Sequence, residues 1–280
     1  MGTSRRYTKL LCSLLGAVVW STALSAEKPT VISLSPAATE LIYEMKLDTH
    51  LIAVDQNSNF PEQAKQLPNI GDPFNPNMEL LAQFQPDLLI HFSRTQVLDT
   101  AKKTLNLTLF PMQPKSMEEL FEQANQLAST LYQDRSAQIT QWRQQWQAIN
   151  QKYNSSPSAN IQQVFVFLGA NPIYTLGKKA FLSKSLHACG VRSLFDEQDF
   201  SSLMVSEEQL LITPPDKVLA GIAANEDSQS RRQQIIETFK KLGIPLSQEQ
   251  VILVNQDILF RPSIRFLNYL PSLCEQLQTL

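Results

Sequence analysis

The sequence predicts an α/β protein in which two Rossmann-like lobes, each with a central parallel sheet, are joined by one long linking helix. Three observations support this fold class. Short apolar runs alternate with helix-like segments, a pattern typical of parallel strands covered by helices on both faces. One segment occurs in both halves of the chain, and a single amphipathic stretch separates the two copies.

The first 26 residues have the layout of a secretory signal peptide. Three basic residues precede an apolar run over residues 10–20, and small residues follow as far as Ala26. The run is shorter than the roughly 18 apolar residues that a membrane-spanning helix needs. We therefore expect residues 1–26 to be a signal peptide that is cleaved near Ala26, so that the mature chain is exported.

The first segment of the mature chain, VISLSPAATELI over residues 31–42, predicts a buried strand that runs into a helix. Ser35 can cap this helix, and Pro36 suits its first turn. In open α/β sheets, ligands bind beyond the carboxyl ends of the strands. We expect the Ser-Pro turn to form one wall of a cleft, although an ordinary capped turn fits the local sequence equally well.

The repeated segment predicts a helix and a strand in each lobe. Residues 79–90 read ELLAQFQPDLLI and residues 208–219 read EQLLITPPDKVL, so that each copy has a glutamate, then Pro-Asp, then an apolar run. Asn77 and Ser206 are the predicted N-caps, and the prolines end the helices before the strands begin. The repeat therefore indicates two lobes with related folds.

The helix that links the lobes is predicted over residues 134–153. Its apolar side chains recur at intervals of three and four residues and so form one stripe. They are Ile139, Trp142, Trp146, Ile149 and Tyr153. This helix places the N-terminal lobe at residues 27–133 and the C-terminal lobe at residues 154–280.

Charge and motif content exclude several functions. Residues 1–26 contain three of the 24 Lys and Arg residues and none of the 26 Asp and Glu residues, which leaves 21 against 26 and a formal net charge of −5. An acidic surface argues against a nucleic-acid partner. The sequence has no GxSxG, HExxH, Walker A or GxGxxG motif, and its three histidines, His50, His91 and His187, are scattered. We expect neither catalytic residues nor a metal site.

Two cysteines remain in the mature chain, Cys189 and Cys274. In an oxidising compartment such a pair is usually bridged, so we expect a disulfide. Two buried free thiols are the alternative. A catalytic cysteine is disfavoured, because His187 is the one histidine close in sequence to either cysteine.

The order of motifs along the chain is typical of a known family. SLSPAATELI lies near the start, NMELL and SEEQLL lie at matched places in the two lobes, and GANPIYTLGK, HACG and DILFRPSIR lie in the C-terminal lobe. In this order, over residues 28–278, the chain resembles the substrate-binding proteins of ABC importers for cobalamin, siderophores and haem. Within that family it is most similar to the members that bind cobalamin, also called vitamin B12.

The resemblance implies a periplasmic binding protein of the helical-backbone type, with no cofactor beyond its transported ligand. Such a protein captures cobalamin or a related corrinoid in the cleft between its lobes and is a monomer before docking. It delivers the ligand to an ABC importer in the inner membrane, which is a permease dimer with its ATPase subunits. Three alternatives stay open: haem or a ferric siderophore as the ligand, an exported enzyme on the same scaffold, and an interaction protein with a filled cleft.

The resemblance also implies roles for single residues. Glu79 and Glu208 correspond to the acidic residues, one per lobe, that dock on arginines of the permease, although the helix dipole alone would also favour them. Asp257 and Arg261 correspond to the segment that contacts the corrinoid, but they could instead pair with each other or face water. The cysteines correspond to the disulfide of the cobalamin binders. The expected ligand-binding residues are Ser35, Pro36, Phe92, Tyr174, Asp257, Phe260 and Arg261.

The sequence departs from the family where the resemblance implies cleft tryptophans and a tyrosine. Pro73-Phe74 and Ser202 stand at the tryptophan positions, and Asn57 stands at the tyrosine position. Aromatic side chains bury the face of a large ligand at low entropic cost, so other aromatics must do this work. The candidates are Phe60, Phe92, Tyr174 and Phe260.

Overall fold

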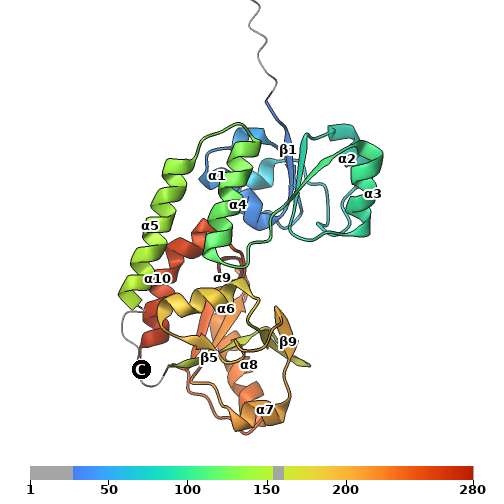
Figure 1. Ribbon diagram of the computed structural model, residues 1–280. Coiled ribbons are helices and arrows are strands. Elements are labelled where there is room, and N and C mark those ends of the chain that lie inside the picture. Colours follow the sequence, from blue (N-terminus) through green and yellow to red (C-terminus); the bar gives the residue numbers. More distant parts are fainter. Residues whose placement is uncertain (1–27, 154–160, 280) are drawn as a thin grey trace, which may run out of the picture.

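The computed structural model describes residues 28–153 and 161–279. The expected signal peptide lies outside the described residues. Figure 1 shows two α/β lobes, one above the other, with helix α5 (Ser136–Tyr153) running along one side from the upper lobe to the lower. None of the described helices is both long enough and apolar enough to cross a membrane.

The N-terminal lobe is built on a parallel four-stranded sheet in the order β2-β1-β3-β4. Its strands are β1 (Val31–Leu34), β2 (Leu51–Val54), β3 (Leu88–His91) and β4 (Thr108–Pro111). Its helices are α1 (Pro36–Glu44), α2 (Met78–Phe84), α3 (Gln96–Leu105) and α4 (Met117–Thr130), with short 3₁₀ turns η1 (Asp48–His50) and η2 (Glu62–Gln66).

The C-terminal lobe has a second parallel sheet in the order β11-β10-β5-β8, and beside it an antiparallel sheet in the order β6-β7-β9. The strands are β5 (Gln163–Phe167), β6 (Gly169–Ala170), β7 (Ile173–Leu176), β8 (Arg192–Ser193), β9 (Ser202–Met204), β10 (Lys217–Ile222) and β11 (Val251–Asn255). The helices are α6 (Phe181–Leu186), η3 (His187–Cys189), α7 (Glu207–Ile212), α8 (Ser228–Lys241), α9 (Gln256–Leu259) and α10 (Ile264–Gln278). The two parallel sheets confirm the predicted fold class, whereas the antiparallel sheet was not expected.

The predicted helix starts are present. The hydroxyl of Ser35 accepts a hydrogen bond from the N–H of Ala38, and Asn77 caps α2 by accepting from two backbone N–H groups. Ser206 and Gln209 form a full capping box at the start of α7. The linking helix α5 begins at Ser136, two residues later than its pattern predicts.

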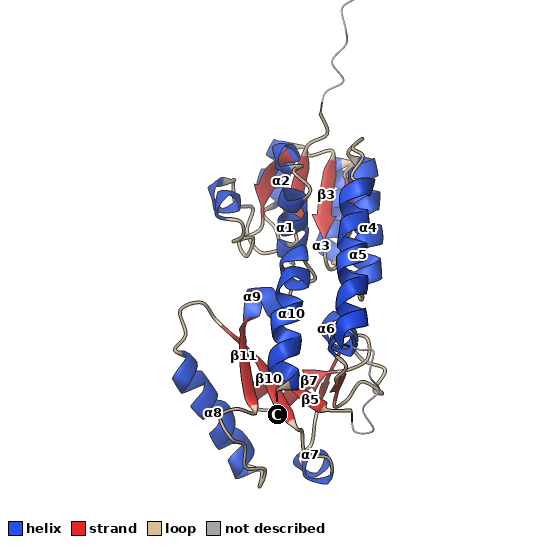
Figure 2. Ribbon diagram, turned by 90° about the vertical axis from the view of Figure 1, so that its left-hand side faces the viewer, coloured by secondary structure: helices blue, strands red, loops and turns tan. Residues whose placement is uncertain are grey.

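One hydrophobic cluster extends through both lobes, because helices from both of them meet at the junction, and each lobe has a further cluster of its own. Apolar side chains of α1, α5 and α10 belong to the same buried cluster, and α10 packs against both α1 and α5. Figure 2 shows α1 stacked above α10, with α5 beside them. The C-terminal helix therefore supports the lobe junction together with α5, a role that its sequence did not indicate.

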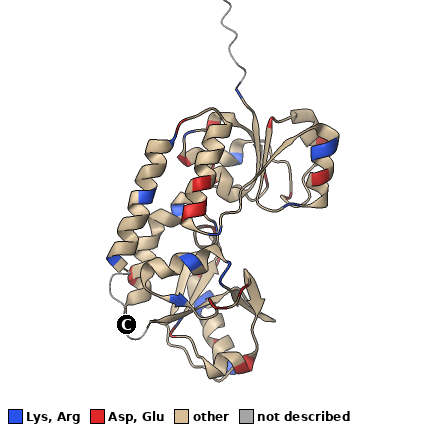
Figure 3. Ribbon diagram, in the orientation of Figure 1, with Lys and Arg blue, Asp and Glu red and all other residues tan. Residues whose placement is uncertain are grey.

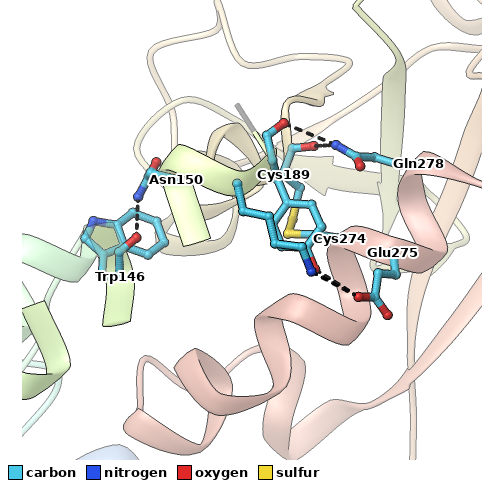
Figure 4. Close-up of a disulfide and its surroundings, with 8 residues drawn as sticks. Trp146, Asn150, Cys189, Cys274, Glu275 and Gln278 are labelled. Carbon is cyan, nitrogen blue, oxygen red and sulfur yellow. Dashed lines mark hydrogen bonds and ion pairs between the residues drawn. A yellow bond between two sulfur atoms is a disulfide. The ribbon is translucent and has the colours of Figure 1, made fainter. Parts of the chain in front are cut away.

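The expected disulfide joins Cys189 in η3 to Cys274 in α10. Figure 4 shows Gln278 reaching across from α10, where its side-chain amide donates to the carbonyl oxygen of Cys189 at 2.8 Å. The same amide donates to the carbonyl oxygen of Tyr153, the last residue of α5. The disulfide and these hydrogen bonds fasten the end of the linking helix to the C-terminal helix, and the alternative of two free thiols is wrong.

Candidate ligand-binding site

A pocket of about 220 Å³ lies between the two lobes. The N-terminal lobe lines it with residues that directly follow three neighbouring strands, namely the turn after β1, Phe92 after β3 and residues 112–114 after β4. The C-terminal lobe closes it with residues 260–262. The pocket therefore lies at the carboxyl edge of the first sheet, where ligands of parallel sheets bind.

The turn after β1 is held in place by buried hydroxyl groups. Thr39 donates to the hydroxyl of Ser33 at 2.9 Å, and the hydroxyls of Thr39 and Ser58 lie 2.9 Å apart. Ser58 in turn donates to the carboxylate of Asp55 at 2.6 Å. Burial raises the pKa of Asp55 above its ordinary value, although the hydrogen bonds from Ser58 and from the backbone oppose this. These hydrogen bonds fix the backbone of the turn that places Ser35 in the pocket wall.

Aromatic side chains stand on both sides of the pocket. Phe92 contacts Phe74 edge to face, with ring centroids 5.1 Å apart. Across the pocket Phe260 lines the C-terminal wall and is still partly exposed. The exposed ring of Phe74 was not among the expected ligand-binding residues, although it stands at a position where the resemblance implies tryptophan.

A second apolar surface lies on the antiparallel sheet of the C-terminal lobe. Tyr174 of β7 stands directly opposite Met204 of β9, so both side chains project from the same face. Both are exposed, Met204 by 62%, and Phe200 just before β9 is also exposed. Figure 1 shows β9 on the side of the lobe away from α5. Tyr174 thus lies on this surface and not among the residues that line the pocket. Strand β9 has only three residues, too few for an alternating pattern to predict that Met204 is exposed.

Arg261 lines the pocket, but its guanidinium is held from several sides. It donates to Asp257 at 2.8 Å, to Glu40 at 3.0 Å and to the side-chain oxygen of Asn59 at 2.7 Å. The pair between Asp257 and Arg261 across one helical turn is therefore present, as one of the sequence alternatives proposed. Contact of either residue with a ligand stays a prediction.

Glu40 is the centre of this interlobe charge cluster, which comprises Glu40, Asn59, Asp257, Arg261 and Arg265. The carboxylate of Glu40 is only 1% exposed and accepts hydrogen bonds from Arg265 as well as Arg261. Burial raises the pKa of Glu40, and the two arginines oppose this shift. Because Glu40 belongs to α1 and both arginines follow α9, the cluster joins the two lobes at the edge of the pocket.

The interlobe charge cluster around Glu40 was not predicted from the sequence. Glu40 is a charged residue inside the apolar pattern of ATELI, and Arg265 lies four residues after Arg261. A carboxylate on the buried face of a helix needs a partner, which was the available signal. The partners lie more than 200 residues away, so the sequence alone could not identify them.

Glu79 and Glu208 lie outside the pocket, in the first turns of α2 and α7. Both are exposed, and within the described part of the chain neither has an ion-pair partner. Hydrogen bonds from its own backbone and from Ser206 lower the pKa of Glu208, so this carboxylate is ionised at neutral pH. Figure 1 shows α2 and α7 at the outer ends of the upper and lower lobes. Docking remains a proposed role for both.

The histidines lie apart in the fold. His50 ends η1 with its Nδ1 atom 2.8 Å from the carbonyl oxygen of Pro29, His91 ends β3, and His187 pairs with Asp196 at 2.8 Å. Over residues 28–153 and 161–279, no group of three or more His, Cys, Asp or Glu side chains is arranged to hold a metal ion.

Comparisons with known proteins agree with this architecture. The pattern of the family described as periplasmic binding protein matches residues 31–241, which is more than half of the chain. A vitamin B12-binding protein of Pectobacterium atrosepticum is 26% identical over 279 residues, covering 97% of this chain and 96% of that protein.

Two solved structures show how far the likeness extends. The periplasmic vitamin B12-binding protein of Vibrio cholerae has a TM-score of 0.69 at 25% identity and covers 90% of this chain and 97% of its own. The periplasmic haem-binding protein of Vibrio cholerae has a TM-score of 0.74 at 16% identity and covers 90% of this chain and 99% of its own. The haem-binding structure is similar in fold alone.

Proposed function

The chain belongs to the periplasmic binding protein family, and from this premise we propose that it captures cobalamin or a related corrinoid in the periplasm for an ABC importer. The family is one of binding proteins and not of enzymes. The observation that supports the proposal most is the interlobe pocket, where Phe92 and Phe260 stand on opposite walls. Relatives described as vitamin B12-binding proteins align over nearly the whole chain.

The size of the pocket bears on how a corrinoid would sit. Pockets that enclose drug-sized ligands measure roughly 300–1,000 Å³, whereas this pocket measures about 220 Å³. It can therefore take one edge of a macrocycle, not the whole ligand. We propose that the rest of the macrocycle lies against exposed aromatic side chains near the pocket, with Phe74 beside Phe92 as the first of them.

Haem is the second candidate ligand, because haem-binding proteins share the fold. Haem carries two carboxylates, which bind best to a cation with free N–H groups. Among the described residues that line the pocket only Arg261 is charged, and both of its terminal nitrogens already donate to Glu40, Asn59 and Asp257. This arrangement supports a ligand without carboxylates, such as cobalamin with its amide periphery, over haem.

Calorimetric titration of the purified mature chain tests the proposal. We expect cyanocobalamin to bind with a dissociation constant of about 1 μM or below, which is about −8 kcal/mol, and hemin to bind more weakly. The absence of heat and of any change in corrin absorption at micromolar concentrations would remove cobalamin as the ligand. Tighter binding of hemin would favour the second candidate.

Replacing Phe92 with alanine should weaken cobalamin binding by about 1–3 kcal/mol, or roughly 5- to 150-fold, because the ring forms one pocket wall and packs against Phe74. The measurement is the same calorimetric titration. Tyr132→Asn is the matched control, since Tyr132 is an exposed aromatic in the turn before α5 and does not line the pocket. Asparagine tolerates its positive φ of 55°. Equal affinity of Phe92→Ala and the control would contradict the assigned site.

A further inference from the structure

We propose that α7 of the C-terminal lobe carries an apolar contact for the importer's permease that α2 of the N-terminal lobe lacks. The inference rests on the proposed function, and it specifies how the contacts of the two lobes with the permease differ. It makes the C-terminal lobe the tighter of the two contacts.

The exposed face of α7 combines acidic and apolar side chains. Glu207 and Leu211 are four residues apart, as are Glu208 and Ile212, so each pair forms neighbours on the helix surface. Ile212 is 82% exposed and Leu211 is 52% exposed. Two bulky aliphatic side chains thus stand one turn beyond two glutamates, with Ile212 almost fully open and Leu211 partly covered beside Gly243.

The matching positions of α2 are different. When the two repeats are aligned on Glu79 and Glu208, Ala82 corresponds to Leu211 and Gln83 corresponds to Ile212. The N-terminal copy therefore presents one glutamate with a small and a polar neighbour. Both helices begin at a side-chain N-cap, Asn77 or Ser206, and lie at matched places in the two repeats, so the comparison is between corresponding positions.

A hollow beside α7 enlarges the same surface. It measures about 390 Å³ and is lined by the first turn of α7, the end of α8 and the residues between β6 and β7. Glu207 is among its lining residues, together with Lys241 of α8. A side chain that projects from a partner could enter this hollow while neighbouring atoms cover Leu211 and Ile212.

Charge complementarity identifies the partner. In Figure 3 acidic residues mark the start of α7, and Glu207 and Glu208 have no ion-pair partner among the described residues. A surface with basic residues around an apolar projection would satisfy both kinds of side chain at once. The proposed function supplies such a partner, the permease surface of the importer that faces the periplasm, and the family resemblance implies the same partner for Glu208.

The test replaces Ile212 of α7 with glutamine, the residue type at the corresponding position 83 of α2. Spheroplasts of the source organism are washed free of periplasmic protein, resupplied with purified chain and given radiolabelled cyanocobalamin, and uptake is followed against chain concentration. We expect Ile212→Gln to raise the half-saturating chain concentration about tenfold, the loss that follows from one buried isoleucine side chain. The matched control Gln83→Ala in α2 should change it less than about twofold.

Calorimetry with cyanocobalamin separates the two proposals. Both variants should bind it as the unmodified chain does, since neither position lines the interlobe pocket. If the unmodified chain fails to bind cyanocobalamin, the proposed function fails. If it binds but gives no uptake, the delivery part of the proposed function fails, and the α7 contact fails with it. If it gives uptake but Ile212→Gln and Gln83→Ala give equal half-saturation, the apolar contact on α7 alone is overturned.

Discussion

Replacing Glu40 with alanine should lower the free energy of unfolding by about 3–5 kcal/mol, because two arginines then share the single carboxylate of Asp257 and one positive charge of the cluster is left without compensation. Glu40 is almost fully buried and is bound by Arg261 and Arg265 from the other lobe. Urea denaturation of the mature chain, followed by circular dichroism, measures the change.

Two further variants show whether the effect comes from the interlobe charge cluster. Glu40→Gln keeps an acceptor oxygen and should cost less than Glu40→Ala, since part of the hydrogen bonding survives. Glu122→Ala removes an exposed glutamate from α4 and should stay within about 0.5 kcal/mol of the unmodified chain. A loss below about 1 kcal/mol for Glu40→Ala would show that the cluster does not hold the lobes together.

Removal of the disulfide by the double change Cys189→Ala and Cys274→Ala should cost about 4–5 kcal/mol in the chain-entropy view, because the bond closes a loop between residues 85 positions apart. The bond also fastens η3 to α10, which packs on α1 and α5 at the lobe junction. Urea denaturation again gives the free energy.

Reduction supplies the internal control for this prediction. Dithiothreitol should lower the stability of the unmodified chain to nearly that of the double variant, and it should leave the double variant unchanged. Equal stability of the oxidised chain and the double variant would mean that the disulfide contributes nothing measurable to the fold.

The parts of the fold that could be predicted are those with local signals. Caps such as Ser35 and Ser206, the repeated Pro-Asp segments and the stripe of α5 are each encoded within a few residues, and the structure contains all of them. The antiparallel sheet β6-β7-β9 was missed because its strands have two to four residues, too few for a hydrophobic period to be read.

The interlobe contacts could not be predicted for a different reason. The contact of α10 with α1, and the hydrogen bonds of Glu40 with Arg261, join residues far apart in the sequence. Nothing local specifies which distant helix receives a buried charge. The resemblance pointed to Arg261 as a ligand contact, but only the fold reveals that both of its terminal nitrogens already donate hydrogen bonds within the protein.

Most of the expected ligand-binding residues lie close together in the fold. Five of the seven expected ligand-binding residues line the interlobe pocket, namely Ser35, Pro36, Phe92, Phe260 and Arg261. Ser35, Pro36 and Phe92 come together because turns after neighbouring parallel strands share one edge of the sheet, and the C-terminal lobe brings Phe260 and Arg261 to that edge. Of the other two, Asp257 pairs with Arg261 and Tyr174 lies on the antiparallel sheet. Whether these residues touch a ligand stays a prediction.

The central claim is that a corrinoid is held between the lobes, and a crystal structure of the mature chain grown with cyanocobalamin tests it most directly. We predict the corrin ring at the interlobe pocket, with one edge between Phe92 and Phe260 and a face against Phe74. A corrin bound elsewhere on the molecule, or crystals without it at saturating concentration, would contradict the account.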